Sequence, residues 1–122
     1  MKQVVCFGEV LWDLFPDGKK LGGAPLNVAL RMKSWGIDSQ MISSVGDDSL
    51  GNEIISRLKV QGLDTKYIQI NKKFDTDIVT VTLDQHGSAS YEIKHPVSWY
   101  KIELLPEHKK LVSTSDAFFL EA

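Results

Sequence analysis

The sequence predicts a layered α/β fold with a mostly parallel sheet, and three observations lead to this prediction. The first 62 residues alternate between short runs of β-forming residues and segments with helical spacing of apolar residues. From residue 76 the pattern changes to the period-two alternation of a β-hairpin. The chain is 43% hydrophobic and 25% charged, a balance typical of one globular domain.

The first element is a strand over residues 4–15, in which the acids Glu9 and Asp13 lie among apolar residues. Burying a carboxylate without partners is costly, so Asp13 faces either water or a ligand with vicinal hydroxyl groups. The residues alone leave both alternatives open. For Glu9 we expect a role in anchoring the backbone rather than in catalysis. A turn at residues 16–18 and a short exposed strand at residues 19–21 follow.

The segment GGAPLN, residues 22–27, is the most informative part of the sequence. A helix is expected to begin here, because Pro25 suits a first helical turn, and to end at Gly36. Gly22 and Gly23 before this helix let a ligand approach the backbone and the free N–H groups of the helix end. Asn27 offers a donor and an acceptor, which suits a sugar hydroxyl better than a phosphate. A plain glycine turn followed by a solvated asparagine is the alternative.

A second strand is predicted over residues 39–45, and Asp48 after it is placed to cap the next helix. This helix should end before Gly62. Its apolar residues recur every fourth position along one face: Leu50, Ile54 and Leu58. The adjacent carboxylates of Asp47 and Asp48 resemble a metal or phosphate loop, but a helix cap explains them better.

The second half of the chain predicts a long β-hairpin, formed by residues 76–83 and 89–93 around a glycine-containing turn. The parallel sheet does not need this pair, so it should project as a separate flap whose apolar face must be covered. Pro96 should end it. A short helix from Pro106 and a buried strand over residues 115–120 complete the chain. A strand with no helix after it suggests a truncated domain.

Charge and hydropathy argue against several classes of partner. Sixteen acidic and 14 basic side chains give a net charge of −2, without the basic surface that nucleic-acid binding needs. No segment approaches the roughly 18 to 20 apolar residues of a membrane span, and no signal peptide is present. Cys6 has no second cysteine to pair with. We therefore expect a cytoplasmic protein that binds neither nucleic acid nor membrane.

The sequence contains no familiar nucleotide-binding or metal-binding motif. The sequence has neither a P-loop nor a dinucleotide fingerprint. Its three histidines lack the spacing that binds zinc, so we expect no metal site and solvated histidines at positions 86, 95 and 108. The tryptophans at positions 12, 35 and 99 are expected to pack in the core or under a flap. Trp12, beside Asp13, has the alternative of lining a sugar pocket.

Three short motifs occur one after another in the first half of the chain. They are G-E-x-x-x-D at residues 8–13, the glycine pair with its asparagine at residues 22–27, and G-x-D-x-x-G at residues 46–51. Together they resemble the N-terminal part of a ribokinase-type (PfkB) carbohydrate kinase, most closely the fructokinase branch, over nearly all 122 residues. The resemblance implies one truncated domain of a three-layer α/β/α fold, with a projecting β-hairpin lid.

The resemblance also implies roles for particular residues. Asp13 would accept hydrogen bonds from two sugar hydroxyls, Gly22 and Gly23 would let the sugar lie against the backbone, and Asn27 would complete the cradle. Glu121 is a further candidate, because some members place a substrate-contacting acid at the end of the corresponding strand. The lid segments, about residues 14–21 and 76–94, would close over the sugar and, in many members, pair with the lid of a second subunit.

The implied activity is that of an ATP-dependent sugar kinase, which transfers the γ-phosphate of ATP to a hydroxyl of fructose. Ribokinase and 2-keto-3-deoxygluconate kinase are alternatives, and ATP and Mg²⁺ are the implied cofactors. The family's second signature, D-T-x-G-A-G-D, holds the catalytic base, and neither it nor the nucleotide-binding segments occur in the 122 residues. We therefore expect no catalytic residue and no turnover in this chain by itself. A non-catalytic fragment that dimerises through its flap is a second hypothesis.

Overall fold

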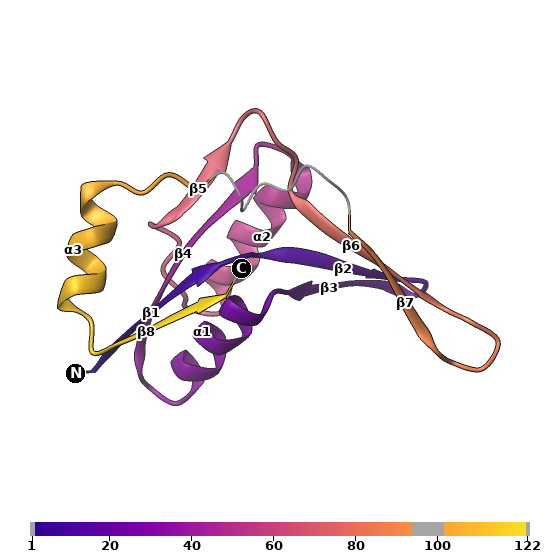
Figure 1. The fold of residues 1–122 in the computed structure, drawn as a ribbon, viewed down its shortest axis with the longest axis horizontal. Helices are drawn as coiled ribbons and strands as arrows, with labels where there is room; N and C mark the ends of the chain where they lie inside the picture. The colour runs from indigo at the N-terminus through magenta and orange to yellow at the C-terminus, as the bar shows by residue number, and fades with distance from the viewer. Residues whose placement is uncertain (1, 94–101, 122) are drawn as a thin grey trace.

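The computed structural model describes residues 2–93 and 102–121, and it contains two sheets that lie side by side (Figure 1). The first, the body sheet, has the strand order β5-β4-β1-β8, and all its pairings are parallel. Its strands are β1 (Gln3–Gly8), β4 (Asp38–Gly46), β5 (Ile68–Asn71) and β8 (Ala117–Glu121). A parallel sheet with crossover helices was the arrangement that the sequence predicted.

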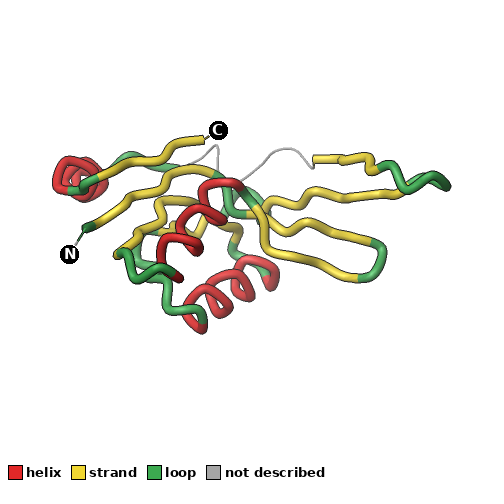
Figure 2. The backbone as a smooth tube through the Cα atoms, turned by 90° about the horizontal axis from the view of Figure 1, so that it is seen from below, coloured by secondary structure: helices red, strands yellow, loops and turns green. Residues whose placement is uncertain are grey.

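Helices cover both faces of the body sheet, so this part of the molecule has three layers (Figure 2). Helices α1 (Ala24–Ser34) and α2 (Ser49–Val60) lie on one face, and α3 (Pro106–Thr114) lies on the other. The larger core forms on the side of α1 and α2, where Ile54 and Leu58 are fully buried, as the fourth-residue spacing predicted. A smaller core joins Leu111 of α3 to two body strands.

The second sheet projects from the body and has the order β3-β2-β6-β7. Its strands are β2 (Leu11–Phe15), β3 (Gly18–Gly22), β6 (Asp77–Leu83) and β7 (Ala89–Ile93). We call it the projecting sheet. The expected hairpin is therefore not a separate flap, because β6 pairs in parallel with β2 and joins both predicted segments into one sheet. The expected Pro96 end of the hairpin, together with His95 and Trp99, lies outside the described residues.

The first predicted strand is divided in two. The chain leaves the body sheet at Gly8, passes through Glu9 and the buried Val10, and enters the projecting sheet at Leu11. Gly8 has φ 146°, a backbone conformation that residues with a side chain rarely adopt. The sequence pattern did not reveal this break because apolar residues continue across it.

Three further expectations about burial were wrong. Strand β8 is not fully buried, since Phe118 is 45% and Leu120 is 60% exposed, and it is the edge strand of the described sheet. His108 is buried rather than solvated, because its ring packs edge-on against Tyr67 and accepts a hydrogen bond from the backbone of the preceding turn. Trp35, in contrast, is largely exposed at the end of α1.

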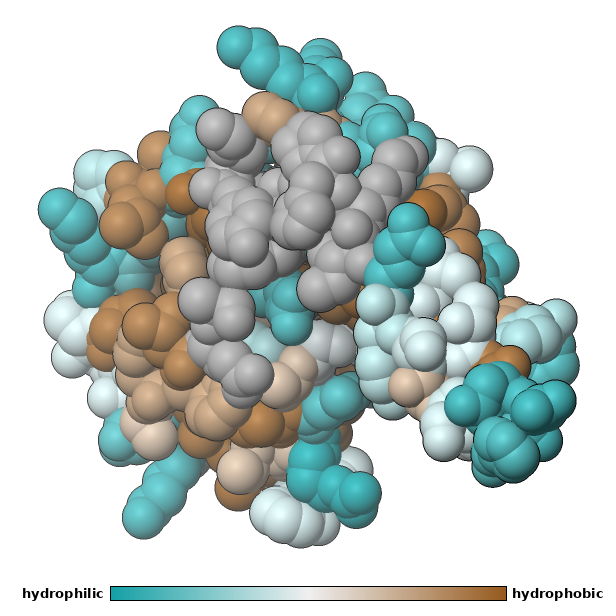
Figure 3. Space-filling model, turned by 45° about the vertical axis from the view of Figure 1, so that its right-hand side comes forward, coloured by the Kyte–Doolittle hydropathy of each residue, from teal (hydrophilic) through white to brown (hydrophobic). Residues whose placement is uncertain are grey.

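The surface of the projecting sheet differs from that of the body. In Figure 3 the projecting part at the right is largely hydrophilic, whereas hydrophobic side chains gather on the body at the left. Within the projecting sheet, Leu11, Val79 and Val81 form a small buried cluster, with Phe15 packed against it. Nearer the tip, Leu83 and Tyr91 are exposed. None of the described helices has the length and apolar character needed to span a bilayer.

Candidate functional site

The candidate site begins at Asp13, which lies in the middle of β2. Side chains alternate along a strand, so Trp12 and Asp13 point to opposite faces of the projecting sheet. Trp12 is fully buried in the larger core, which excludes the alternative that it lines an open sugar pocket. Asp13 is half-buried on the other face, and desolvation raises the pKa of its carboxyl group. The carboxylate is therefore held at a partly dehydrated position, where a hydroxyl-bearing ligand can replace the lost water.

Gly22 lies directly beside this carboxylate. In the antiparallel pairing of β2 with β3, Leu11 is opposite Gly22 and Asp13 is opposite Lys20. A Cβ atom at Gly22 would collide with Oδ2 of Asp13 and would come within 3.0 Å of the Leu11 side chain. The absence of a side chain at Gly22 thus creates the space that the Asp13 carboxylate occupies.

Gly23 is required for a different reason. Its φ of 107° is a conformation that favours glycine, and a Cβ atom here would collide with the carbonyl oxygen of Glu9. Gly23 is also the N-cap of α1, and its carbonyl oxygen accepts a 3.0 Å hydrogen bond from the backbone N–H of Asn27. No side chain within residues 2–93 and 102–121 caps this helix end. Its first N–H groups can therefore serve a ligand.

The structure brings most of the predicted residues together. Gly22 lies beside the Asp13 carboxylate, and Gly23 follows Gly22 in the chain. The exposed Asn27 lies one helical turn beyond Gly23. Glu121 pairs in register with Gly8, at the carboxyl ends of β8 and β1, so its backbone lies at the edge of the sheet from which the chain enters β2. The sequence-predicted residues thus share one region at the carboxyl edge of the body sheet.

A second group of residues ties the projecting sheet to the body. Asp48 caps α2 as predicted, because its Oδ1 accepts from the backbone N–H of Gly51 at 2.7 Å. The same carboxylate accepts from the hydroxyl of Thr76 at 2.6 Å and from the backbone N–H of Thr76 at 2.9 Å. The Thr76 hydroxyl in turn accepts from the N–H of Gly46 at 2.9 Å. Sequence reasoning placed Thr76 only at the start of a strand, since nothing local to it indicates this network.

The glycines of the G-x-D-x-x-G motif are explained by the same network. A Cβ atom at Gly46 would collide with the backbone nitrogen of Thr76, and one at Gly51 would collide with the carbonyl oxygen of Gly46. The motif therefore holds the end of β4, the start of α2 and the start of β6 in close contact. The hydrogen bond from Gly51 to Asp48 confirms the predicted helix cap.

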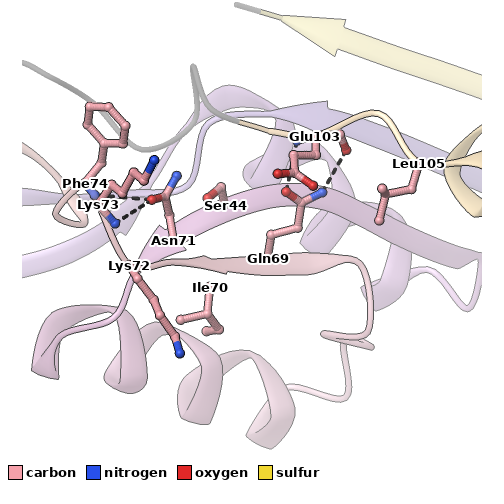
Figure 4. Close-up of a pocket in the computed structure, with 9 residues that line it drawn as sticks. All are labelled: Ser44, Gln69, Ile70, Asn71, Lys72, Lys73, Phe74, Glu103 and Leu105. Atoms are coloured by element: carbon pink, nitrogen blue, oxygen red, sulfur yellow. Dashed lines mark hydrogen bonds between the residues drawn. The ribbon is translucent and has the colours of Figure 1, made fainter.

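A hollow of about 790 Å³ lies elsewhere on the same edge, at the carboxyl ends of β4 and β5 (Figure 4). The side chain of Gln69 pairs there with both backbone groups of Glu103, at 2.9 and 3.0 Å. Asn71 accepts from the backbone N–H of Lys73 at 2.8 Å. None of the described lining residues is one of the predicted site residues. The hollow and the Asp13 region are therefore separate candidates.

Fold and site together define an α/β protein with a three-layer body and a projecting sheet, and a polar, glycine-lined region at the carboxyl edge of its parallel strands. The solved structure of a putative ribokinase II from E. coli, 21% identical, has the same fold over 98% of this chain, with a TM-score of 0.82. The chain belongs to the pfkB family of carbohydrate kinases, because the family's model matches residues 1–122.

The chain is also similar to a sugar kinase and to a sugar-phosphate kinase. The chain is 36% identical to a fructokinase of Klebsiella pneumoniae over 69% of its length, which is 29% of that protein. It is 33% identical to an ATP-dependent 6-phosphofructokinase of Thermoanaerobacterium thermosaccharolyticum over 92% of its length, which is 37% of that protein. The chain thus spans about a third of the length of these relatives.

Two solved fructokinases match in structure. The Vibrio cholerae enzyme, in a form with fructose, ADP and calcium ion bound, is 31% identical, with a TM-score of 0.69; the match covers 81% of this chain and 34% of that one. The Xylella fastidiosa enzyme with bound ATP is 25% identical, with a TM-score of 0.81; the match covers 97% of this chain and 38% of that one. These likenesses confirm the predicted resemblance to the fructokinase branch.

Proposed function

We propose that this chain is the acceptor-binding part of an ATP-dependent sugar kinase and that fructose is its preferred acceptor. The observation that carries the proposal is the position of the Asp13 carboxylate, which lies against the bare backbone of Gly22 and next to the uncapped end of α1. A carboxylate is an acceptor with several lone pairs, whereas backbone N–H groups are donors. Such a pair suits a polyhydroxy molecule, because each hydroxyl both donates and accepts.

In this proposal each residue has a defined task. Asp13 accepts hydrogen bonds from two neighbouring hydroxyls of the sugar, Gly22 and Gly23 allow close approach, and Asn27 binds at the rim. Glu121 is proposed as a further contact from the end of β8. Burial around Asp13 strengthens these hydrogen bonds, because water competes less for the carboxylate there.

The projecting sheet is proposed to act as the lid, with its segments at about residues 14–21 and 76–94. A lid over the sugar keeps out water, which would compete as phosphoryl acceptor. We also propose that a homodimer forms through this sheet, and the exposed Leu83 and Tyr91 near its tip support this. Static light scattering tests the dimer: a monomer at every concentration reached would overturn it, whereas a dimer that Tyr91→Ser dissociates would support it.

ATP is the proposed phosphoryl donor and Mg²⁺ the proposed metal of the reaction. Within residues 2–93 and 102–121, no three His, Cys, Asp or Glu side chains are grouped as a metal site would require. The described residues therefore offer no such cluster of metal ligands, and we assign none of them to Mg²⁺ or to ATP. The proposed task of this chain is to position the acceptor, and it is expected to show no turnover by itself.

Isothermal titration calorimetry tests the proposal directly. Fructose, ribose and 2-keto-3-deoxygluconate are each titrated into the chain and into its Asp13→Asn variant. Asp17→Asn, in the exposed turn between β2 and β3, is the matched control. We expect fructose to bind best, Asp13→Asn to weaken binding by at least about tenfold, and the control to bind normally. Equal binding by Asp13→Asn, or a preference for another of the three compounds, would contradict the proposal.

A phosphorylated sugar is a second candidate acceptor, and one observation favours it. Lys20 lies directly opposite Asp13 and on the same face of the sheet, so its ammonium group can reach an anionic substituent of a bound sugar. It now lies 5.2 Å from the centre of the Phe15 ring. The relative named as an ATP-dependent 6-phosphofructokinase agrees with this candidate.

The two candidates differ in their response to Lys20→Met. If fructose 6-phosphate is the acceptor, it binds more tightly than fructose, and the substitution weakens it selectively. If fructose is the acceptor, the substitution leaves its affinity within about twofold, because a neutral sugar gains little from an exposed cation. A chain that binds neither compound would contradict both candidates.

A further inference from the structure

Helix α2 presents one row of residues to the root of the projecting sheet. Leu50, Glu53 and Arg57 are separated by three and four positions, so they lie along one face of the helix. Trp12 of β2 fits against this face and is fully buried. Its indole Nε1 donates a 3.0 Å hydrogen bond to the carbonyl oxygen of Leu50.

Two cations lie over the same indole ring, and one carboxylate joins them. Lys19 Nζ and the Arg57 guanidinium are each 5.1 Å from the ring centre of Trp12. Glu53 bridges them, because its Oε1 is 3.3 Å from Lys19 Nζ and its Oε2 is 3.3 Å from Arg57 Nη2. Lys19 comes from β3, whereas Glu53 and Arg57 come from α2. We call these four side chains the Trp12 clamp.

The clamp acts on the strand that carries the candidate site. Trp12 and Asp13 are neighbours on β2 with opposite orientations, so a strand fixed through Trp12 also has a fixed position for the Asp13 carboxylate. Lys19 extends the attachment to β3, the strand that ends in Gly22. Both strands that form the site are thus attached to one helix of the body.

We propose that the Trp12 clamp is a positioning device, which holds β2 and β3 on α2 and thereby places Asp13 for the acceptor sugar. This proposal rests on the proposed function, since it assigns a purpose to the position of Asp13. Glu53, Lys19 and Arg57 are positioning residues in it, because they surround the Trp12 ring, on the face of the projecting sheet opposite to Asp13.

The partial exposure of the clamp predicts that salt weakens it. The side chains of Lys19, Glu53 and Arg57 are 33%, 37% and 51% exposed. Ion pairs with this exposure are individually weak and are screened by salt, while the two contacts with the buried ring add to their strength. Fructose carries no charge, so salt has no direct effect on its own interactions. An affinity for fructose that falls with ionic strength is therefore expected to come from the clamp.

Hydrogen exchange of the backbone amides tests the clamp without any ligand. The variants are Glu53→Gln and Arg57→Gln, both at partly exposed positions that the core does not need. Arg31→Gln is the matched control, because Arg31 lies 6.0 Å over the ring of the exposed Trp35, away from the projecting sheet. Glu107→Gln, in the first turn of α3, controls for the loss of a carboxylate.

The expected result is exchange about three- to tenfold faster in β2 and β3 for both clamp variants, with β1 and β4 unchanged and both controls like the parent chain. Unchanged exchange in β2 and β3 would overturn the proposal. Equal acceleration in every strand would also overturn it, because that pattern shows a general loss of stability.

Sugar affinity provides the second readout. Fructose affinity in the parent chain is expected to fall as salt rises, and Glu53→Gln is expected to bind several-fold more weakly with little salt dependence. Salt dependence that persists in Glu53→Gln would overturn the positioning role. If the parent chain binds no sugar, the proposed function is wrong, and so is the role of the clamp in placing Asp13 for a sugar. The hydrogen-exchange measurement still decides whether the clamp attaches β2 and β3 to α2.

Discussion

At the scale of single residues, Asp13 combines a cost in stability with a proposed gain in binding. Desolvation raises the pKa of its carboxyl group in the folded chain. The folded state therefore holds this proton more tightly than the unfolded state, and folding loses stability as the pH rises from the ordinary aspartate pKa through the raised value. The carboxylate is retained at a site where its ionised form is disfavoured, which is typical of a functional group.

The first prediction concerns pH. Binding of fructose is expected to weaken as the pH falls through the raised pKa of Asp13, because a protonated carboxyl group loses acceptor capacity for the sugar hydroxyls. Asp13→Asn is expected to bind weakly at every pH and to be at least as stable as the parent chain near neutral pH. Calorimetric titrations and thermal unfolding over a pH series measure both. A variant that is clearly less stable at neutral pH would contradict this account.

The second prediction separates the two glycines. Gly22→Ala places a Cβ atom on the Asp13 carboxylate, so it should reduce fructose affinity by at least about tenfold while the free energy of unfolding changes by about 1 kcal/mol. Gly23→Ala adds a strained φ and a collision with the Glu9 carbonyl, so it should cost about 2 kcal/mol or more. Urea unfolding and calorimetry distinguish the two. Equal losses of stability would show that the Gly22 position is structural as well.

The sequence predicted the roles of residues whose interaction partners are close to them along the chain. The glycine doublet followed by Pro25 predicted where α1 begins, and the cap at Asp48 follows from its place before a helix. Thr76 and Glu53 were missed because their partners are distant along the chain: Thr76 binds Asp48, 28 positions away, and Glu53 binds Lys19 across two elements. No periodicity in one sequence reveals such pairs.

At the scale of elements, two polar networks among the described residues attach the projecting sheet to the body. One is the Thr76 network at the start of β6, and the other is the Trp12 clamp on β2 and β3. Between them they fix the roots of three of the four strands. The sequence predicted the strands of this sheet but not the parallel pairing of β2 with β6, because strand pairing depends on tertiary structure and not on local pattern.

The third prediction tests the Thr76 attachment. Thr76→Val keeps the shape of the side chain but leaves the buried N–H of Gly46 without its acceptor, so it should cost about 1 to 3 kcal/mol. Amide exchange should accelerate most in β6 and β7. Thr82→Val, on an exposed position of the same strand, is the control and should change neither quantity. Identical behaviour of the two variants would show that the network contributes nothing.

At the scale of the whole molecule, the chain corresponds to only part of each relative that it matches. It covers about a third of the length of its relatives, and the exposed Phe118 and Leu120 lie on the edge strand β8. The alternation of strands and helices predicted a layered fold with a mostly parallel sheet, and the resemblance to the PfkB kinases implied its three layers. The exposure of β8 was not predicted, because its apolar pattern is that of a strand with both faces covered.

The most direct test of the central claim is a titration of the ¹⁵N-labelled chain with fructose, followed by amide chemical shifts. Asp13, Gly22, Gly23 and Asn27 are expected to show the largest changes, because these are the residues that the sugar is proposed to contact. Shifts concentrated instead around Gln69, Asn71 and Glu103 would place the sugar in the hollow at β4 and β5 and would contradict the account.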